Sequence, residues 1–236
     1  MDQDIKDLYG RKLGATDGAI GHIKDFYFAD KTWHLRYVVA DTGSWLSGRQ
    51  VLLSPHAFGP HAFGPPEADP DVVPVNLTRR QIEDSPSIDS HRPISRQYEE
   101  DYHRYFGWPS YWVAGGMGSV TGFTPVVVPP MPPLPPPGER HPKEDLHLRS
   151  TKEVTGYHLQ ATDGKLGAIR SFMVDGKTWA IPELVVETGH WYAGKPILIL
   201  TETIRRISYE DKTVFVSFDT EDIRKTMGNA VAKRPA

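Results

Sequence analysis

The sequence predicts a mainly β protein with two small, partly open antiparallel β-barrels, short helices and a proline-rich connector. Three observations predict this class: an internal repeat, short strand patterns bounded by turn residues in each copy, and a proline run between the copies. The 236 residues suffice for two domains, and the 39% hydrophobic content supports packed cores.

The internal repeat is carried by ATDGAIGHIKDFYFADKTW (15–33) and ATDGKLGAIRSFMVDGKTW (161–179). Residues 15–53 align with residues 161–199 without a gap, and 16 of the 39 aligned positions are identical. A repeat of this length predicts two copies of one fold. We therefore expect a first domain at 1–112, a Gly/Pro-rich linker at 113–145, a second domain at 146–227 and a tail at 228–236.

Each copy has the local pattern of short β-strands. Asp17-Gly18 and Asp41-Thr42-Gly43 are turn sequences, and both recur 146 residues later. Trp33, Leu35, Tyr37 and Val39 alternate with other residues as in a half-buried strand. The runs VLL (51–53) and ILIL (197–200) are typical of core strands, and ISYEDKTVFVSF (207–218) predicts a hairpin about residues 210–212.

Two helical segments follow the first copy's strands. Thr78 and Gln81 have the spacing of a capping box, and Asp219 and Asp222 take those places in the second copy. A second helix is predicted at about 95–106, where Gly107 and Pro109 would end it. Beyond it, PPMPPLPPP (129–137) favours polyproline II structure, which we interpret as a spacer.

These residues resemble the PRC-barrel family. The resemblance rests on TDG with IGHIKDFYFAD, on W…VVADTG, and on VPVNLTRRQIEDSPSIDSHRPISRQYEEDYHRYFGWPSYW (73–112), which is similar to the tail of stand-alone bacterial members. It covers roughly residues 5–112 and 150–225 and implies small barrels used as assembly modules. Relatives include the C-terminal part of the photosynthetic reaction-centre H chain and a ribosome-maturation factor domain. The family shares no catalytic residue.

The pentapeptide PHAFG occurs twice in succession, at 55–59 and 60–64. Between 53 and 73 the spacing of the repeat changes from 146 to 141, so the first copy holds five additional residues in this interval. We interpret the duplication as a loop insertion whose removal leaves the fold intact. The alternative is a metal or ligand clamp at His56 and His61.

Composition excludes several kinds of site. The chain has no cysteine, which removes disulfides and thiolate chemistry, and no H-x-x-x-H pattern occurs. We expect no catalytic residue, no metal site and no cofactor. The repeated Asp17, Asp163, Asp41 and Glu187 are interpreted as turn formers, with a shared ligand site as the alternative.

The candidate partner-binding residues lie in one aromatic segment that has no counterpart in the second copy. Aromatic side chains dominate interface hot spots because they bury a large area with few rotors. Packing within the chain or a dimer is the alternative for this segment. Its members are Tyr98, Tyr102, Tyr105, Phe106, Trp108, Tyr111 and Trp112.

The sequence thus predicts a non-enzymatic interaction or scaffold module that binds a protein partner or self-associates, for example as a homodimer. The net charge of −3 argues against nucleic-acid binding. No apolar stretch reaches the length of a transmembrane segment, and the charged N-terminal stretch differs from a signal peptide, so a cytoplasmic location is expected. By analogy with the H chain, the alternative is an accessory protein of a photosynthetic or electron-transport complex.

Overall fold

The computed structural model describes residues 2–59, 63, 71–86, 94, 96–109, 148–188, 195–221 and 223. The chain divides into two compact units. One unit is Met1–Glu83 together with His147–Ala236, and the other is Asp84–Leu146. Both copies of the repeat therefore belong to the same unit. The predicted connector at 113–145 and the tail at 228–236 lie outside the described residues.

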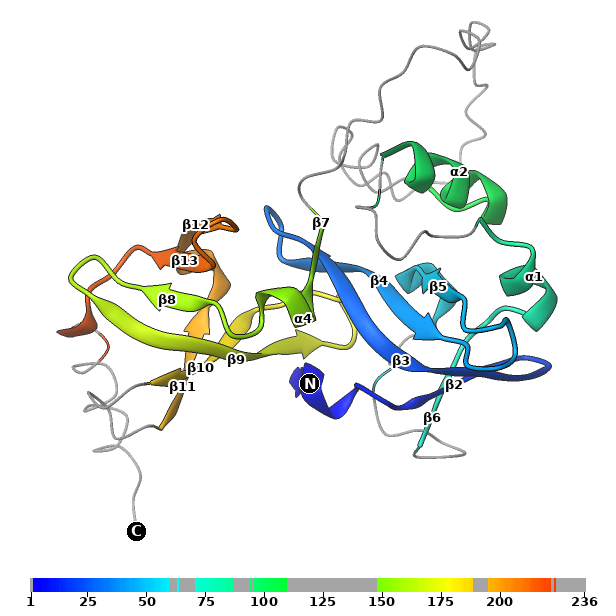
Figure 1. Cartoon of the computed structure of the whole chain (residues 1–236), viewed down its shortest axis with the longest axis horizontal. Helices are drawn as coiled ribbons and strands as arrows, with labels where there is room; N and C mark the ends of the chain where they lie inside the picture. Colours follow the sequence, from blue (N-terminus) through cyan, green and yellow to red (C-terminus); the bar gives the residue numbers. More distant parts are fainter. Residues whose placement is uncertain are drawn as a thin grey trace, which may run out of the picture. The chain divides into compact units, whose positions relative to one another are not determined.

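The first copy forms a six-stranded sheet in the order β5-β4-β3-β2-β6, with β7 (Leu148–Ser150) also pairing with β3 (Figure 1). Short 3-10 turns, η1 (Ile5–Asp7) and η2 (Pro55–Ala57), and helix α1 (Arg79–Glu83) flank these strands. The strand bounds are β1 (Asp2–Asp4), β2 (Lys12–Ala15), β3 (Gly18–Ala29), β4 (His34–Asp41), β5 (Gln50–Leu53) and β6 (Val72–Pro74).

The second copy forms a seven-stranded sheet in the order β11-β10-β9-β8-β13-β12, with β1 pairing with β9. Helix α4 (Thr151–Val154) precedes its long strands, and the 3-10 turn η4 (Thr201–Thr203) follows β11. The strand bounds are β7 (Leu148–Ser150), β8 (His158–Gln160), β9 (Lys165–Asp175), β10 (Glu183–Thr188), β11 (Pro196–Leu200), β12 (Ile204–Ser208) and β13 (Thr213–Val216).

The prediction of a mainly β chain is confirmed, and each copy of the repeat builds its own sheet. The described strands do not close either sheet into a barrel, so the barrel stays a prediction. One strand pair in each sheet differs from the antiparallel expectation: β6 runs parallel to β2, and β13 runs parallel to β8. Parallel strands cannot be joined by a tight hairpin, and here strands β3–β5 lie in the sequence between β2 and β6, and strands β9–β12 lie between β8 and β13.

The two copies exchange their first strands. Strand β1 pairs with β9 of the second copy, with Asp2 opposite Asp175 and Asp4 opposite Met173. Strand β7, which lies 146 residues after β1, pairs with β3 of the first copy, with Leu148 opposite Ala29 and Ser150 opposite Tyr27. These registers are equivalent at the 146-residue spacing. The exchange is thus reciprocal, and it joins the repeats into one unit (Figure 1).

Several local predictions agree with the structure. Thr78 and Gln81 form the capping box: the Gln81 amide donates to Thr78 Oγ1 at 3.2 Å, and the Thr78 amide donates to Gln81 Oε1 at 2.9 Å. The predicted hairpin is β12–β13, in which Ser208 lies opposite Thr213. Helix α2 (Arg96–Phe106) occupies the predicted range, and Gly107 follows it with a φ of 68°.

The run ILIL, interpreted as a core strand, forms β11, but only alternate side chains of this strand are buried. In β11 the side chains of Ile197 and Ile199 are buried, whereas Leu198 and Leu200 are exposed. Successive side chains of a strand point to opposite faces, and only one face of β11 lies against the core. The equivalent strand of the first copy, β5, has three consecutive buried residues, Val51, Leu52 and Leu53.

Candidate interaction sites

The predicted aromatic segment forms a cluster along α2 within the unit Asp84–Leu146. The rings of Tyr98 and Tyr102 stack with centroids 6.1 Å apart, and those of Phe106 and Trp108 stack at 4.4 Å. Tyr102 also contacts Phe106 at 5.0 Å and Trp108 at 5.9 Å. The i, i+4 spacing of the helix brings three of these rings together, and the chain beyond Gly107 returns Trp108 to them.

Polar contacts hold this cluster in place. The Trp108 amide donates to the His103 carbonyl at 2.9 Å, and His103 Nδ1 lies 3.1 Å from the Pro109 carbonyl oxygen. The Tyr98 hydroxyl donates to the Pro86 carbonyl at 2.9 Å. The cluster is therefore ordered by bonds at both ends of α2.

The members of the aromatic segment differ in their access to solvent. Tyr102 is completely buried, whereas Tyr105 is 42% exposed and touches Phe106 at 4.8 Å. Tyr98, Phe106 and Trp108 are half-buried. Tyr111 and Trp112 lie outside the described residues. Among the described members, Tyr105 offers the most side-chain surface to a partner, and Tyr102 offers none.

The repeated acidic residues hold turns and helix starts. Asp17 accepts from the Arg79 amide at 2.7 Å, where α1 begins. Asp163 accepts from the Thr220 amide at 2.9 Å at the corresponding point of the second copy. A carboxylate that accepts an unpaired amide at a helix start stabilises the helix. These hydrogen bonds support the interpretation of Asp17 and Asp163 as residues with a local structural role.

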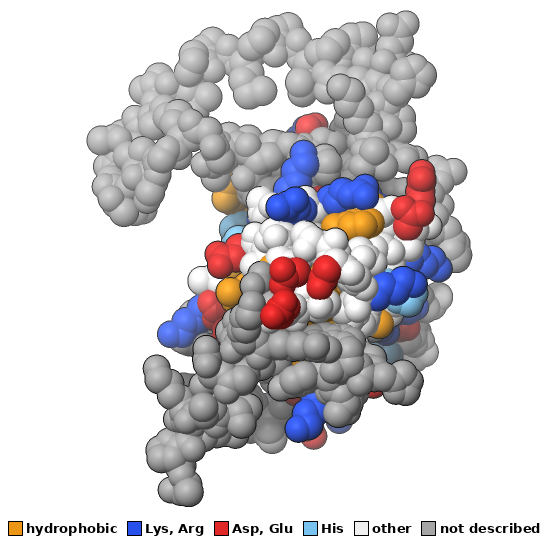
Figure 2. Space-filling model, turned by 90° about the vertical axis from the view of Figure 1, so that its left-hand side faces the viewer, with side chains coloured by type: hydrophobic (Ala, Val, Ile, Leu, Met, Phe, Trp, Pro, Cys, Tyr) orange, Lys and Arg blue, Asp and Glu red, His pale blue; other side chains and the backbone are white. Residues whose placement is uncertain are grey.

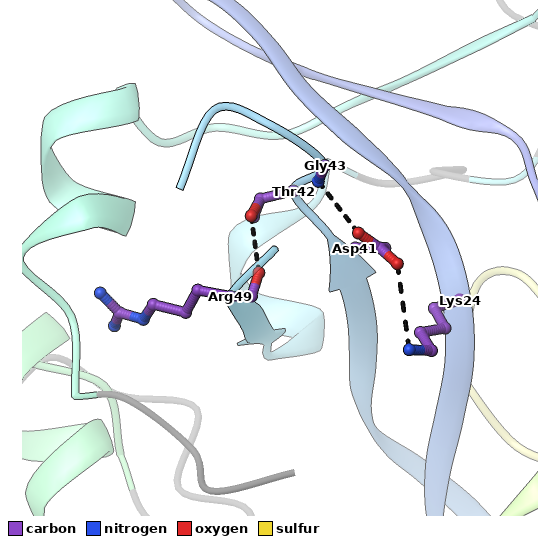
Figure 3. A network of polar contacts seen from close by, with 5 residues as sticks. All are labelled: Lys24, Asp41, Thr42, Gly43 and Arg49. Atoms are coloured by element: carbon purple, nitrogen blue, oxygen red, sulfur yellow. Dashed lines mark hydrogen bonds and ion pairs between the residues drawn. The ribbon is translucent and has the colours of Figure 1, made fainter. Parts of the chain in front are cut away.

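The turn after β4 uses its acid in the same way. Asp41 Oδ1 accepts from the Gly43 amide at 2.9 Å, and Thr42 Oγ1 donates to the Arg49 carbonyl at 2.6 Å (Figure 3). Lys24 Nζ lies 3.9 Å from the other Asp41 oxygen. In the second copy Thr188 donates to the Lys195 carbonyl at 2.8 Å, which reproduces the threonine bond. The bond between Thr42 and Arg49 holds together the two ends of the loop between β4 and β5.

Sequence reasoning missed a polar junction at each exchanged strand. Asp25 accepts from Ser150 Oγ at 2.5 Å and from Thr151 Oγ1 at 3.0 Å. At the equivalent point of the other junction, Ser171 donates to Asp4. The acid lies on the long strand at one junction and on the exchanged strand at the other. Only an alignment of the two copies pairs these positions, because neither residue stands in a recognisable motif.

Sequence reasoning also missed the exposed outer row of β11. Leu198 and Leu200 are 51% and 46% exposed, whereas Leu52, which aligns with Leu198, is 2% exposed. Within the described residues β11 pairs only with β10, so it is an edge strand. An edge strand with exposed apolar side chains is a typical surface for association. The alternating exposure could have been expected from the period of a strand.

The sequence predicts no metal site and no membrane-spanning segment. Both predictions can be examined only in the part of the chain that the structure describes. There, no group of three or more His, Asp or Glu side chains is placed to hold a metal ion. Among the same residues, no helix is both long and apolar enough to cross a membrane. His61, half of the alternative clamp, lies outside these residues.

Neither a scan against protein-family models nor a search of the curated proteins finds a match to this chain. The resemblance to PRC-barrel domains, and the electron-transport role that it implies as an alternative, therefore stay predictions from the sequence.

Proposed function

We propose that this chain is a non-enzymatic interaction or scaffold module built on two PRC-barrel-like repeats. The observation that carries the proposal is the outer row of β11, where Leu198 and Leu200 are exposed side by side on an edge strand. Exposed apolar side chains lower their free energy by leaving water, at roughly 25 cal/mol per Å² of buried surface. A protein partner or a second copy of this chain can supply that burial.

The backbone amide and carbonyl groups of β11 also favour the binding of a partner. Its hydrogen bonds within the described residues go to β10, from Glu183 opposite Leu200 to Glu187 opposite Pro196. The other edge can accept an added strand, a binding mode in which backbone bonds give affinity and side chains give specificity. Leu198 and Leu200 would then contact the side chains that the added strand places on the same, outer face of the sheet. The reciprocal exchange of β1 and β7 is an example of strand addition within this chain.

The test replaces the two leucines with charged residues. We expect the double variant Leu198→Asp with Leu200→Asp to lose self-association, which sedimentation equilibrium measures over a range of concentrations. If the occupant is another protein, we expect the variant to lose the capture of that partner, which mass spectrometry identifies. His158→Asp with Glu202→Gln is the control, because both positions are exposed in the same copy. The control should behave like the wild-type chain. If the leucine variant also behaves like the wild-type chain in both measurements, the proposal is wrong.

A further inference from the structure

The backbone groups of β11 alternate between the two edges of the strand. The Thr201 amide, directly after β11, donates to the Pro182 carbonyl at 2.9 Å in the register of the β10–β11 ladder. The amide and carbonyl groups of successive residues in an antiparallel strand point to opposite edges. The odd-numbered positions of β11 therefore bond to β10, and the even-numbered positions point to the outer edge.

The residues at the two ends of β11 fit this assignment. Pro196 has no amide hydrogen, and proline is found in sheets where that hydrogen would face away from the neighbouring strand. The Leu200 carbonyl already accepts from the Thr203 hydroxyl at 2.6 Å. Within the described residues, the outer edge therefore presents the Pro196 carbonyl, both backbone groups of Leu198 and the Leu200 amide.

These groups are complementary to themselves when two chains place their β11 strands antiparallel about Leu198. Leu198 then lies opposite Leu198 of the second chain, and the two residues exchange both amide-to-carbonyl bonds. The Leu200 amide donates to the Pro196 carbonyl of the second chain. The reverse bond is missing because proline has no donor, but the Leu200 carbonyl that would accept it is already bonded to Thr203. This register leaves no edge group of β11 without a partner.

The same register also covers the exposed leucines. Opposite residues of an antiparallel pair place their side chains on the same face of the sheet. Ile197 and Ile199 face the core, so Leu198 and Leu200 lie on the outer face. There Leu198 would contact Leu198 of the second chain, and Leu200 would contact Pro196. A second chain thus removes from water the side chains that are exposed on β11.

The charges at the ends of β11 favour the antiparallel direction. Lys195 precedes the strand, Glu202 follows it, and both are exposed. Antiparallel strands bring each Lys195 to the end of the pair that carries Glu202 of the other chain, whereas parallel strands would bring like charges together. Complementary charges of this kind fix the register of an interface and suppress wrong pairings.

The wider surface does not oppose self-association. Figure 2 faces the side that carries the second copy of the repeat, and it shows Asp and Glu side chains in the middle of this surface with Lys and Arg side chains above them. Both signs of charge are thus present on one face. The net charge of −3 is small, so overall repulsion between two chains is weak.

We propose that two chains associate through their β11 strands, paired antiparallel about Leu198, so that their two seven-stranded sheets become one continuous sheet. The inference rests on the proposed function, because it names a second chain as the occupant of the same edge. One strand pair is a small interface, so we expect a weak dimer with a dissociation constant of about 10 µM or more. Unfolding measured at lower concentrations therefore reports the monomer.

The first experiment removes a backbone donor from the outer edge. Leu198→Pro deletes the amide that points away from β10, so no bond to β10 is lost and the strand can form. Leu198→Ala is the matched control, because it shortens the side chain but keeps the amide. In sedimentation equilibrium of the full chain, we expect a dimer for the wild type, a weaker dimer for Leu198→Ala and a monomer for Leu198→Pro. Thermal unfolding checks that both variants fold.

The second experiment reverses the charges and leaves β11 itself unchanged. Lys195→Glu places a carboxylate beside Glu202 of the other chain, and Glu202→Lys places two ammonium groups together. Each variant alone should dimerise about tenfold more weakly than the wild type, because like charges that lie opposite each other are destabilising. An equimolar mixture of the two variants should recover the wild-type affinity as a heterodimer, since each end of the pair then joins opposite charges.

Two controls accompany the charge reversal. Lys165→Glu makes the same change of charge at an exposed position of β9 and should dimerise like the wild type. Neutralising Glu202 should leave association almost unchanged, because an exposed ion pair adds little affinity by itself. A loss of affinity in Lys165→Glu equal to that in Lys195→Glu would mean that only the total charge matters, which contradicts the proposed register.

The outcomes distinguish this inference from the proposed function. A wild-type chain that stays monomeric up to about 1 mM contradicts the dimer. If the variant Leu198→Asp with Leu200→Asp nevertheless loses a captured protein, the proposed function holds and the occupant is a different protein. A dimer that survives Leu198→Pro, or a charge-reversed mixture that does not recover affinity, overturns the pairing about Leu198. If the leucine variant also keeps every partner, the proposed function fails as well.

Discussion

The two copies of the repeat share one arrangement of strands but complete their cores differently. Beside Trp179 the rings of Phe58 and Phe63 pack at 5.2 Å and 4.6 Å, whereas beside Trp33 the ring of Phe28 stacks at 5.2 Å. The two tryptophans lie at equivalent backbone positions, since the Leu35 amide donates to the Trp179 carbonyl and the Ile181 amide donates to the Trp33 carbonyl. Phe63 belongs to the second PHAFG pentapeptide, which occurs only in the first copy, and its side chain is 4% exposed. This burial argues against the interpretation of the pentapeptide as a loop insertion whose removal leaves the fold intact.

The largest expected effect is at Phe63, whose ring packs against that of Trp179. Phe63→Ala should lower the free energy of unfolding by about 3–5 kcal/mol, because it removes a buried ring and leaves a cavity beside Trp179. Denaturant unfolding measures this change. Tyr105→Ala, at an exposed ring, is the control and should cost less than about 1 kcal/mol. A loss at Phe63 no greater than at Tyr105 would show that the pentapeptide is a dispensable loop after all.

The second comparison uses the same residue type at equivalent positions of the two copies. Leu52→Ala should cost about 2–5 kcal/mol, since Leu52 is 2% exposed. Leu198→Ala should change stability by about 0.5 kcal/mol or less, because half of that side chain is already in water. Thermal and denaturant unfolding of both variants measure the difference. Similar losses would mean that Leu198 is covered in solution.

The sequence predicted the repeat, the mainly β class and most local structure because these depend on neighbouring residues. The capping box at Thr78 and Gln81 and the hairpin at 210–212 are examples. It could not predict the exchange of β1 and β7, since each is three residues long and its partner strand belongs to the other copy.

The candidate sites were harder to predict for a related reason. Phe63 looked like part of a copied loop, and only its distance to Trp179, 116 residues away, reveals its role in the core. The rings of Tyr98, Tyr102 and Phe106 are in contact because the helical period places residues i, i+4 and i+8 on one face of α2. Which of these rings is exposed depends on tertiary burial, and sequence spacing carries no information about it.

The third prediction compares the two exchanged-strand junctions. Asp25→Ala should cost about 2–3 kcal/mol, because Asp25 accepts from two hydroxyls and also from the Lys152 amide at 3.2 Å. Ser171→Ala at the other junction should cost about 1 kcal/mol, since it removes one bond to Asp4. Urea unfolding of both variants measures this asymmetry. Equal losses would show that the second junction depends on contacts besides the Asp4 bond.

The smallest expected effects are at the two helix starts. Asp17→Ala and Asp163→Ala should each lower the free energy of unfolding by about 1 kcal/mol, because each removes an acceptor for the first helical amide. Asp17→Asn and Asp163→Asn keep an acceptor oxygen and should recover part of that loss. If instead either acid belonged to a ligand site, its alanine variant would leave stability unchanged. The comparison of alanine with asparagine, made by thermal unfolding in both copies, therefore separates a structural role from a binding role at positions that the repeat itself identifies.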